Sequence, residues 1–92
     1  MLRTKDNRVR NDIRLYRRRA DLKLYQLAHL IGTSSASNVA NWEKGRKVPT
    51  LDNLLLLSAA LKVPMQYLYL DRWRQMQQLV RERSAIPAKK PL

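Results

Sequence analysis

Apolar residues recur at helical spacing along the first third of the chain. A first helix is predicted by four apolar residues placed three or four positions apart: Val9, Ile13, Tyr16 and Ala20. Asn7 and Asn11 are both suitable N-cap residues for this helix. A second helix is predicted from about Leu24 to Ile31, and its inward face is formed by Leu27, Ala28 and Ile31. Gly32 predicts its end, because glycine readily adopts the left-handed conformation found there.

A third helix is predicted in the serine-rich stretch that follows. Ser34 and Ser35 carry hydroxyls that suit an N-cap, and the helix is expected to continue to about Lys44. Gly45 then predicts its end. Its buried stripe is expected to consist of two residues three positions apart, Val39 and Trp42.

Two more helices are predicted in the second half of the chain. Thr50, directly after Pro49, is a suitable N-cap for the fourth, whose inward face is formed by Leu54, Leu57, Ser58 and Leu61. The fifth begins at Pro64 and meets no Gly or further Pro before Pro87, so we expect it to reach about Arg83. It carries one apolar stripe: Met65, Leu68, Tyr69, Trp73, Met76, Leu79 and Val80. No segment has the pattern of a strand, so the chain is predicted to be all-α.

Net charge gives the first indication of a partner. The 92 residues contain 19 Lys and Arg against 7 Asp and Glu, a formal charge of +12. Both ends of the chain carry this excess, including an arginine-rich face on the first helix: Arg8, Arg10, Arg14, Arg17, Arg18 and Arg19. A polyanion is the expected partner, because basic side chains release the counterions condensed on nucleic acid. Charge alone does not distinguish specific from nonspecific binding.

Composition argues against catalytic and metal chemistry. The chain has no cysteine, one histidine and no Gly-rich phosphate loop, and its acids are scattered. We therefore expect no enzyme activity, no cofactor and no metal site. The longest apolar run, residues 54–60, is too short to span a bilayer. A cytoplasmic protein with no membrane contact is expected.

Several motifs occur together in a familiar order: Ile13-Arg14 with Arg17, Leu27-Ala28, Ile31-Gly32, Val39, Trp42-Glu43-x-Gly45, Pro49, Leu54, Leu61, Val63 and Leu68. From Ile13 to about Tyr69 the chain resembles the helix-turn-helix domains of Cro and phage repressors, which include xenobiotic-response-element-type regulators. The resemblance implies a five-helix, lambda-repressor-like DNA-binding domain, here with an extended C-terminal helix.

The resemblance also implies how such a domain meets DNA. The second helix crosses the phosphate backbone while the third lies in the major groove. Four residues of the third helix are then expected to read bases: Ala36, Ser37, Asn38 and Asn41. Asn pairs with adenine edges, Ser bonds to several edges and Ala contacts the thymine methyl, so a site rich in A·T pairs is expected. The plainer alternative is a capped, solvated helix.

Side chains around the third helix are expected to hold the phosphate backbone: Arg14, Tyr25, Gln26, Ser35, Lys44, Arg46 and Lys47. By resemblance, Arg17 and Glu43 form a structural ion pair that joins the third helix to the first. Trp42 shares a stripe with Val39, so we expect it in the core.

Two departures from the family pattern affect these assignments. Lys23-Leu24 replaces the customary Ser or Thr followed by Gln, which leaves Lys23, Tyr25 or Gln26 to supply that phosphate contact. The interval from Gly32 to Trp42 is also one residue longer than the common spacing. We expect the turn to absorb this residue, since an insertion within the helix would rotate its outer face by about 100°.

Apolar residues outside the expected core suggest a partner surface. Leu55 and Leu56 lie off the inward face of the fourth helix, while Trp73 and Met76 lie where the fifth exceeds one domain. We expect a homodimer through these helices, reading half-sites roughly 34 Å apart. The alternative is a fifth helix that folds back onto its own domain.

The predicted organisation is a basic arm at 1–6, a helix-turn-helix domain at 7–69, an extension of the fifth helix at 70–83 and a disordered basic tail at 84–92. Arg3 and Lys5 in the arm, and the tail, are expected to add groove or phosphate contacts. The predicted function is a bacterial or phage transcriptional regulator, associated with the nucleoid, that represses by binding operator DNA. Two alternatives are an antitoxin-like interaction module that binds a partner through the fifth helix and autoregulates, and a nonspecific nucleic-acid binder.

Overall fold

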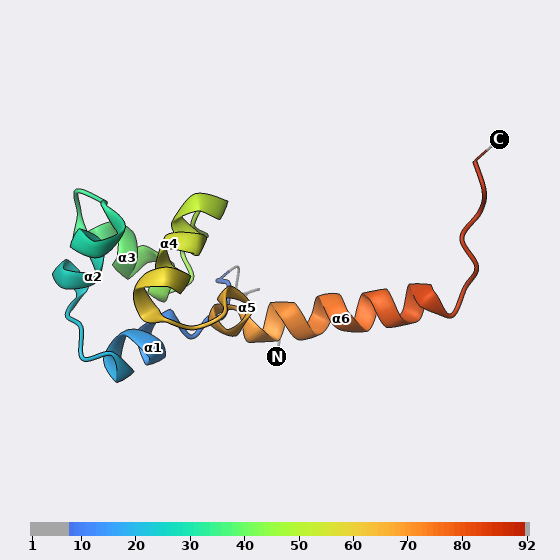
Figure 1. Cartoon of the computed structure of the whole chain (residues 1–92), viewed down its shortest axis with the longest axis horizontal. Coiled ribbons are helices and arrows are strands. Elements are labelled where there is room, and N and C mark those ends of the chain that lie inside the picture. The colour runs from blue at the N-terminus through green and yellow to red at the C-terminus, as the bar shows by residue number, and fades with distance from the viewer. Residues whose placement is uncertain (1–7, 92) are drawn as a thin grey trace, which may run out of the picture.

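The computed structural model describes residues 8–91, which form six helices and contain no strand (Figure 1). In chain order the helices are α1 Ile13–Arg19, α2 Leu24–Ile31, α3 Ala36–Glu43, α4 Leu51–Leu61, α5 Met65–Leu68 and α6 Leu70–Ser84. The first five pack into a small domain, and α6 projects from it as an arm. The all-α prediction is therefore confirmed. Asn7 and the arm at 1–6, with Arg3 and Lys5, lie outside the described residues.

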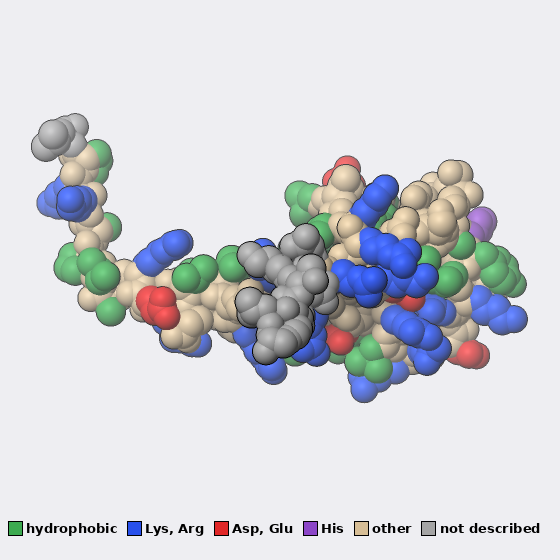
Figure 2. All heavy atoms as spheres, turned by 180° about the vertical axis from the view of Figure 1, so that it is seen from behind, with side chains coloured by type: hydrophobic (Ala, Val, Ile, Leu, Met, Phe, Trp, Pro, Cys, Tyr) green, Lys and Arg blue, Asp and Glu red, His purple; other side chains and the backbone are tan. Residues whose placement is uncertain are grey.

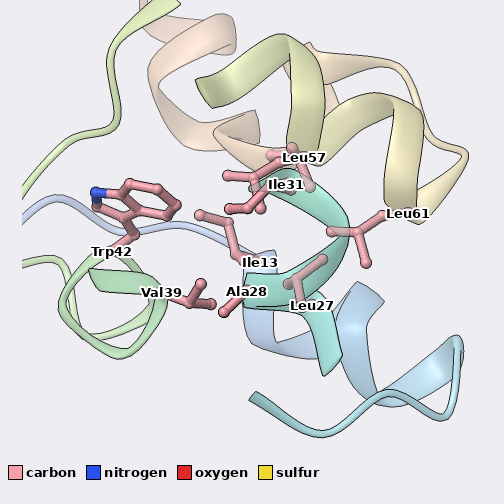
Figure 3. Packing of buried hydrophobic residues seen from close by; sticks show 9 residues of the cluster. Ile13, Leu27, Ala28, Ile31, Val39, Trp42, Leu57 and Leu61 are labelled. Atoms are coloured by element: carbon pink, nitrogen blue, oxygen red, sulfur yellow. The ribbon is translucent and has the colours of Figure 1, made fainter. Parts of the chain in front are cut away.

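The core of the domain draws on every helix from α1 to α5. Its buried apolar residues are Ile13, Leu27, Ala28, Ile31, Val39, Trp42, Leu57, Leu61 and Leu68. Fully burying one Leu, Ile or Val side chain contributes about 1.5–3 kcal/mol, so this cluster is the main source of stability. Trp42 lies at the edge of the cluster, and its indole nitrogen points away from the other side chains (Figure 3).

None of the helices within residues 8–91 has the length and apolarity needed to cross a bilayer.

The first helix begins later than the sequence predicted. Val9 precedes α1, and its amide donates to the carbonyl of Gly45 at 3.1 Å. Asn11 Oδ1 accepts the amide of Ile13 at 3.1 Å, so this side chain satisfies a donor at the helix start. Arg8 and Arg10 therefore lie outside the helix, and the predicted arginine-rich face is wrong at those two positions. The helix is shorter because its N-terminal segment pairs with the loop after α3.

The second helix and the turn that follows agree with the prediction. α2 has the predicted bounds, and Gly32 ends it with φ at +79°. Ser35 is the N-cap of α3, where its hydroxyl accepts the amide of Ser37 at 3.1 Å. α3 then runs without interruption from Ala36 to Glu43, as expected if the turn absorbs the additional residue between Gly32 and Trp42.

The fourth helix also begins as predicted. Thr50 Oγ1 accepts the amide of Asn53 at 3.2 Å, which caps α4. Leu57 and Leu61 are buried on its inward face, and the hydroxyl of Ser58 donates to the carbonyl of Val63 beyond the helix end. This hydroxyl explains the polar residue on an otherwise apolar face, because it closes the turn into α5.

The predicted fifth helix is two helices. Its backbone breaks at Tyr69, where φ is −130° and ψ is 55°. The carbonyl of Leu68 accepts the amide of Asp12 at 2.8 Å, which anchors the end of α5 to the segment before α1. Tyr69 packs against the core, and burial raises the pKa of its unpartnered hydroxyl to about 12. The single-helix prediction was wrong because this anchor involves a residue far away in sequence.

The break also changes the predicted apolar stripe. Leu68 is buried in the domain, whereas no residue of α6 is buried. Trp73 and Met76 are 44% and 42% exposed, so the alternative in which they fold back into their own domain is wrong. α6 ends at Ser84, one residue beyond the predicted end, and residues 87–91 have no regular secondary structure.

Candidate nucleic-acid interface

A buried ion pair joins α3 to α1. Arg17 Nε donates to Glu43 Oε2 at 2.6 Å, and Arg17 Nη2 donates to Glu43 Oε1 at 3.2 Å. Arg17 Nη1 also donates to the carbonyl of Leu22 at 2.8 Å, in the turn between α1 and α2. The two side chains are only 11% and 6% exposed. A bidentate guanidinium in this position fixes the end of α3 in both distance and direction, and it is the pair that the resemblance implies.

Asn11 forms a second clamp on the same end of α3. Its Nδ2 donates to the carbonyl of Trp42 at 2.8 Å and to the carbonyl of Val9 at 3.1 Å. The Trp42 carbonyl belongs to the last turn of α3 and also accepts the amide of Gly45 at 3.0 Å, so Asn11 adds a second donor at this helix end. The sequence predicts Asn11 only as an N-cap of the first helix. Nothing in the local pattern indicates a contact with Trp42, so this role was missed.

Gly45 permits the close approach between the N-terminal segment and the loop after α3. Its φ is +75°, a conformation that glycine adopts without strain. A Cβ at this position would lie 2.5 Å from the carbonyl oxygen of Val9 and 2.9 Å from its nitrogen. Space and conformation therefore both require glycine here, and this requirement fixes the path of the loop.

The outer face of α3 is polar. Ser37 and Asn38 are exposed, and Asn41 is half-buried one turn further along. Asn38 Nδ2 donates to Thr33 Oγ1 at 2.7 Å, and the hydroxyls of Ser35 and Ser37 are 2.7 Å apart. Short hydrogen bonds of this kind hold the first turn of the helix in place. Ala36 differs from the other three predicted base-reading residues, because its half-buried side chain packs against the core.

Basic side chains border this face. Lys44, Arg46 and Lys47 follow α3 directly and are all exposed. The amides of Arg46 and Lys47 both donate to the carbonyl of Asn41, at 2.9 and 3.4 Å, so the loop folds back along the helix. Figure 2 shows many Lys and Arg side chains spread over the face of the domain opposite to the view of Figure 1.

The remaining predicted phosphate contacts come from three other elements. Arg14 on α1 and Tyr25 on α2 are exposed, and Ser35 at the start of α3 is half-buried. Gln26 is half-buried, and its Oε1 accepts the amide of Lys23 at 2.8 Å. That bond caps α2 in place of the customary Ser or Thr, so Gln26 has a structural role as well.

Other chemistry finds little support in the described part of the chain. Across residues 8–91, no group of three or more His, Asp or Glu side chains is placed to hold a metal ion. The histidine, His29, is exposed near the end of α2. The polar face of α3 and its basic border are therefore the strongest candidate site.

Comparison with known proteins identifies this arrangement. Residues 13–68 match the model of a helix-turn-helix family, and this match spans more than half of the chain. The chain belongs to this helix-turn-helix family, the Cro and phage-repressor type. Helices α2 and α3 with the intervening turn form the helix-turn-helix itself. The family match ends at Leu68, where α5 also ends, so α6 is an addition to the helix-turn-helix domain.

A solved structure gives the same fold. The restriction-modification controller protein C.AhdI from Aeromonas hydrophila superposes with a TM-score of 0.55 and 31% sequence identity. The similarity covers 60% of this chain and 82% of that chain. No curated protein matches the sequence. Together, the helix-turn-helix family and this neighbour support a DNA-binding transcriptional regulator.

Proposed function

We propose that the chain is a sequence-specific transcriptional regulator that binds operator DNA as a dimer and represses by occupying a promoter. One observation carries the proposal: the polar outer face of α3 directly borders the exposed basic loop of Lys44, Arg46 and Lys47. Helix-turn-helix proteins read base edges with the second helix of the motif, while neighbouring groups hold phosphates. The buried clamps at the end of α3 support this function, because base reading requires a helix in a fixed position.

Individual roles follow from exposure and chemistry. Ser37, Asn38 and Asn41 are proposed to read bases, and Ala36 is proposed to contact a thymine methyl at the edge of the face. Since α3 carries no Lys or Arg, operators rich in A·T pairs are expected. The proposed phosphate contacts are Arg14, Tyr25, Gln26, Ser35, Lys44, Arg46 and Lys47. Gln26 retains its Nε2 for such a contact while its oxygen caps α2.

Selection of bound sites from a random duplex library tests sequence reading. We expect enrichment of a palindrome whose half-sites are about one helical turn apart, roughly 34 Å, because a symmetric dimer reads two copies of one half-site. The selected duplex should then compete at least a thousandfold better than random duplex at one fixed salt concentration, in the range of about 10³–10⁷ typical of specific binding. Equal competition by the two duplexes would contradict sequence-specific regulation and favour a nonspecific nucleic-acid binder.

The exposed helix α6 supports a second candidate function. α6 buries none of its residues and carries exposed Trp73 and Met76, as expected if it binds another protein. An antitoxin-like module would use α6 for a partner and the DNA-binding domain for autoregulation. Expression of the chain together with the products of its neighbouring genes tests this role. A stoichiometric complex that is lost in the Trp73→Glu variant would support the module, and a chain that purifies alone would argue against it.

A further inference from the structure

One side of α4 is exposed, apolar and acidic. Asp52, Leu55, Leu56 and Ala59 follow the spacing of a single helix face, and all four are exposed. Leu55 and Leu56 are 47% and 42% exposed. Together with Asp52, they line a shallow hollow of about 380 Å³. Residues 51–61 contain no Lys or Arg, so Asp52 is the charge that marks this face.

α6 presents a face with the same spacing and the opposite charge. A hollow of about 350 Å³ is lined by Trp73, Met76, Gln77, Val80 and Arg81. The helix carries four arginines: Arg72, Arg74, Arg81 and Arg83. At 100° per residue, its two acids, Asp71 and Glu82, lie on the side away from this hollow. Figure 2 shows hydrophobic side chains along the arm with basic ones among them.

These two faces do not meet within one chain. α6 projects from the domain (Figure 1), and none of its residues is buried. Its 15 residues give a helix about 22 Å long, enough to lie across the 11 residues of α4 in another molecule. A second copy of the chain therefore supplies what each face lacks.

On the basis of the proposed dimer, we infer that two copies of the chain exchange their α6 helices. The α6 of each copy packs across the α4 of the other, with Leu55 and Leu56 against Trp73, Met76 and Val80. Asp52 of one copy then pairs with Arg81 of the other. Because the contact occurs twice, each half needs to bury only about 600–1,000 Å² to reach the 1,200–2,000 Å² typical of stable interfaces.

Charge favours exchange over pairing of like helices. A contact between two α4 helices would offer only acidic side chains, and a contact between the two α6 hollows would offer only arginines, so neither could form an ion pair. Like charges in contact across an interface disfavour it, whereas exchange sets an acid against a base in both contacts.

Charge reversal tests the exchange. The full-length variants Asp52→Arg and Arg81→Asp are examined by sedimentation equilibrium in the absence of DNA. Each single reversal should raise the dissociation constant of the dimer about tenfold or more, because two attractive pairs become two repulsive ones. The double variant should return to within about threefold of wild type. An equimolar mixture of the two single variants should form a heterodimer as tight as the wild-type dimer, since both of its contacts are again complementary.

The controls separate this inference from the proposed function. Glu82→Arg reverses a charge on the far side of α6 and should leave the dissociation constant unchanged, and circular dichroism should show equal helix content in all variants. If α4 packs on α4, or α6 on α6, a single reversal replaces one like-charge contact by another and should leave the dissociation constant unchanged. Single variants with an unchanged dissociation constant would therefore contradict the exchange of α6 helices but not the dimer itself. A wild type that remains monomeric overturns both the exchange and the proposed dimer.

Discussion

The helices α3 and α6 are joined to the rest of the domain by ion pairs of very different kinds. Arg17 and Glu43 hold α3 through two hydrogen bonds with side chains that are 11% and 6% exposed. Arg10 and Asp71 connect to α6 across 3.4 Å with side chains that are 88% and 49% exposed. A buried, bidentate pair fixes a helix, whereas an exposed pair in water contributes little. The candidate reading helix is therefore rigidly placed, and the arm gains little from its own ion pair.

Removal of one acid from each ion pair should have the largest effect and tests whether burial distinguishes the two pairs. Glu43→Ala should lower the free energy of unfolding by about 3–5 kcal/mol, because it leaves the guanidinium of Arg17 buried without its partner. Asp71→Ala should lower it by less than about 1 kcal/mol, since both of its groups are already hydrated. Urea denaturation followed by circular dichroism measures both values. Similar losses in the two variants would show that burial does not distinguish the pairs.

The two glycines offer a matched test of how closely α3 is held. Gly45→Ala should cost about 2–4 kcal/mol, because it adds a clash with the Val9 backbone to the strain of a left-handed alanine. Gly32→Ala should cost only the strain, about 1–2 kcal/mol, since no atom lies within 4 Å of its added Cβ. Chemical denaturation of both variants checks the difference. Equal costs would mean that the segment at Val9 moves away easily and does not hold the loop.

Substitutions on the outer face of α3 and in the basic loop after it should change DNA binding in two different ways. Asn38→Ala should cost about 1–3 kcal/mol on the selected operator and little on random duplex, as expected for a base contact. Arg46→Ala should weaken binding to both duplexes alike and reduce the salt dependence by about one unit, as expected for a phosphate contact. Fluorescence anisotropy over a range of salt concentrations measures both effects. If the two variants respond identically, α3 does not read sequence.

The smallest expected effect concerns the break between α5 and α6. Tyr69→Phe removes a buried hydroxyl that has no partner, so the stability at neutral pH should change by less than about 1 kcal/mol. Burial raises the pKa of Tyr69 from 10.0 to about 12, so the folded state binds the proton more tightly than the unfolded state. The contribution of Tyr69 to the free energy of unfolding of the wild type should therefore be constant below pH 10 and should fall as the pH rises from 10 to about 12.

Thermal unfolding of wild type and the Tyr69→Phe variant between pH 9 and 12 checks the alkaline effect. The difference in stability between the two proteins should shift in favour of the variant as the pH passes 10. A difference that stays constant with pH would show that the Tyr69 hydroxyl titrates equally in the folded and unfolded chains.

Local signals made parts of the fold predictable. α2 has its predicted bounds because Gly32 ends it within its own turn, and α4 begins where Thr50 caps it. The break at Tyr69 was not predictable, since it depends on a hydrogen bond between Leu68 and the distant Asp12. Position along a helix pattern carries no information about such a partner.

The candidate site, like the fold, was only partly predictable from the sequence. The basic loop after α3 is visible in the sequence as consecutive charges. The pairing of Arg17 with Glu43 was expected only through the family resemblance, because neither residue has a local pattern that indicates the other. Asn11 was assigned to one helix although it serves two, and Ala36, expected on the outer face of α3, is half-buried at the edge of that face and packs against the core. Tertiary contacts decide these positions.

The close packing of Val9 on Gly45 has a practical consequence for anyone who labels this protein. Arg8 and Val9 lie against Gly45, in the loop that carries Lys44, Arg46 and Lys47, so a dye attached at position 8 would lie beside this basic loop. A bulky or acidic label at that position should interfere with DNA binding. A fluorophore placed beyond Ser84 is separated from the domain by the whole length of α6, which makes that end the better place to attach a probe.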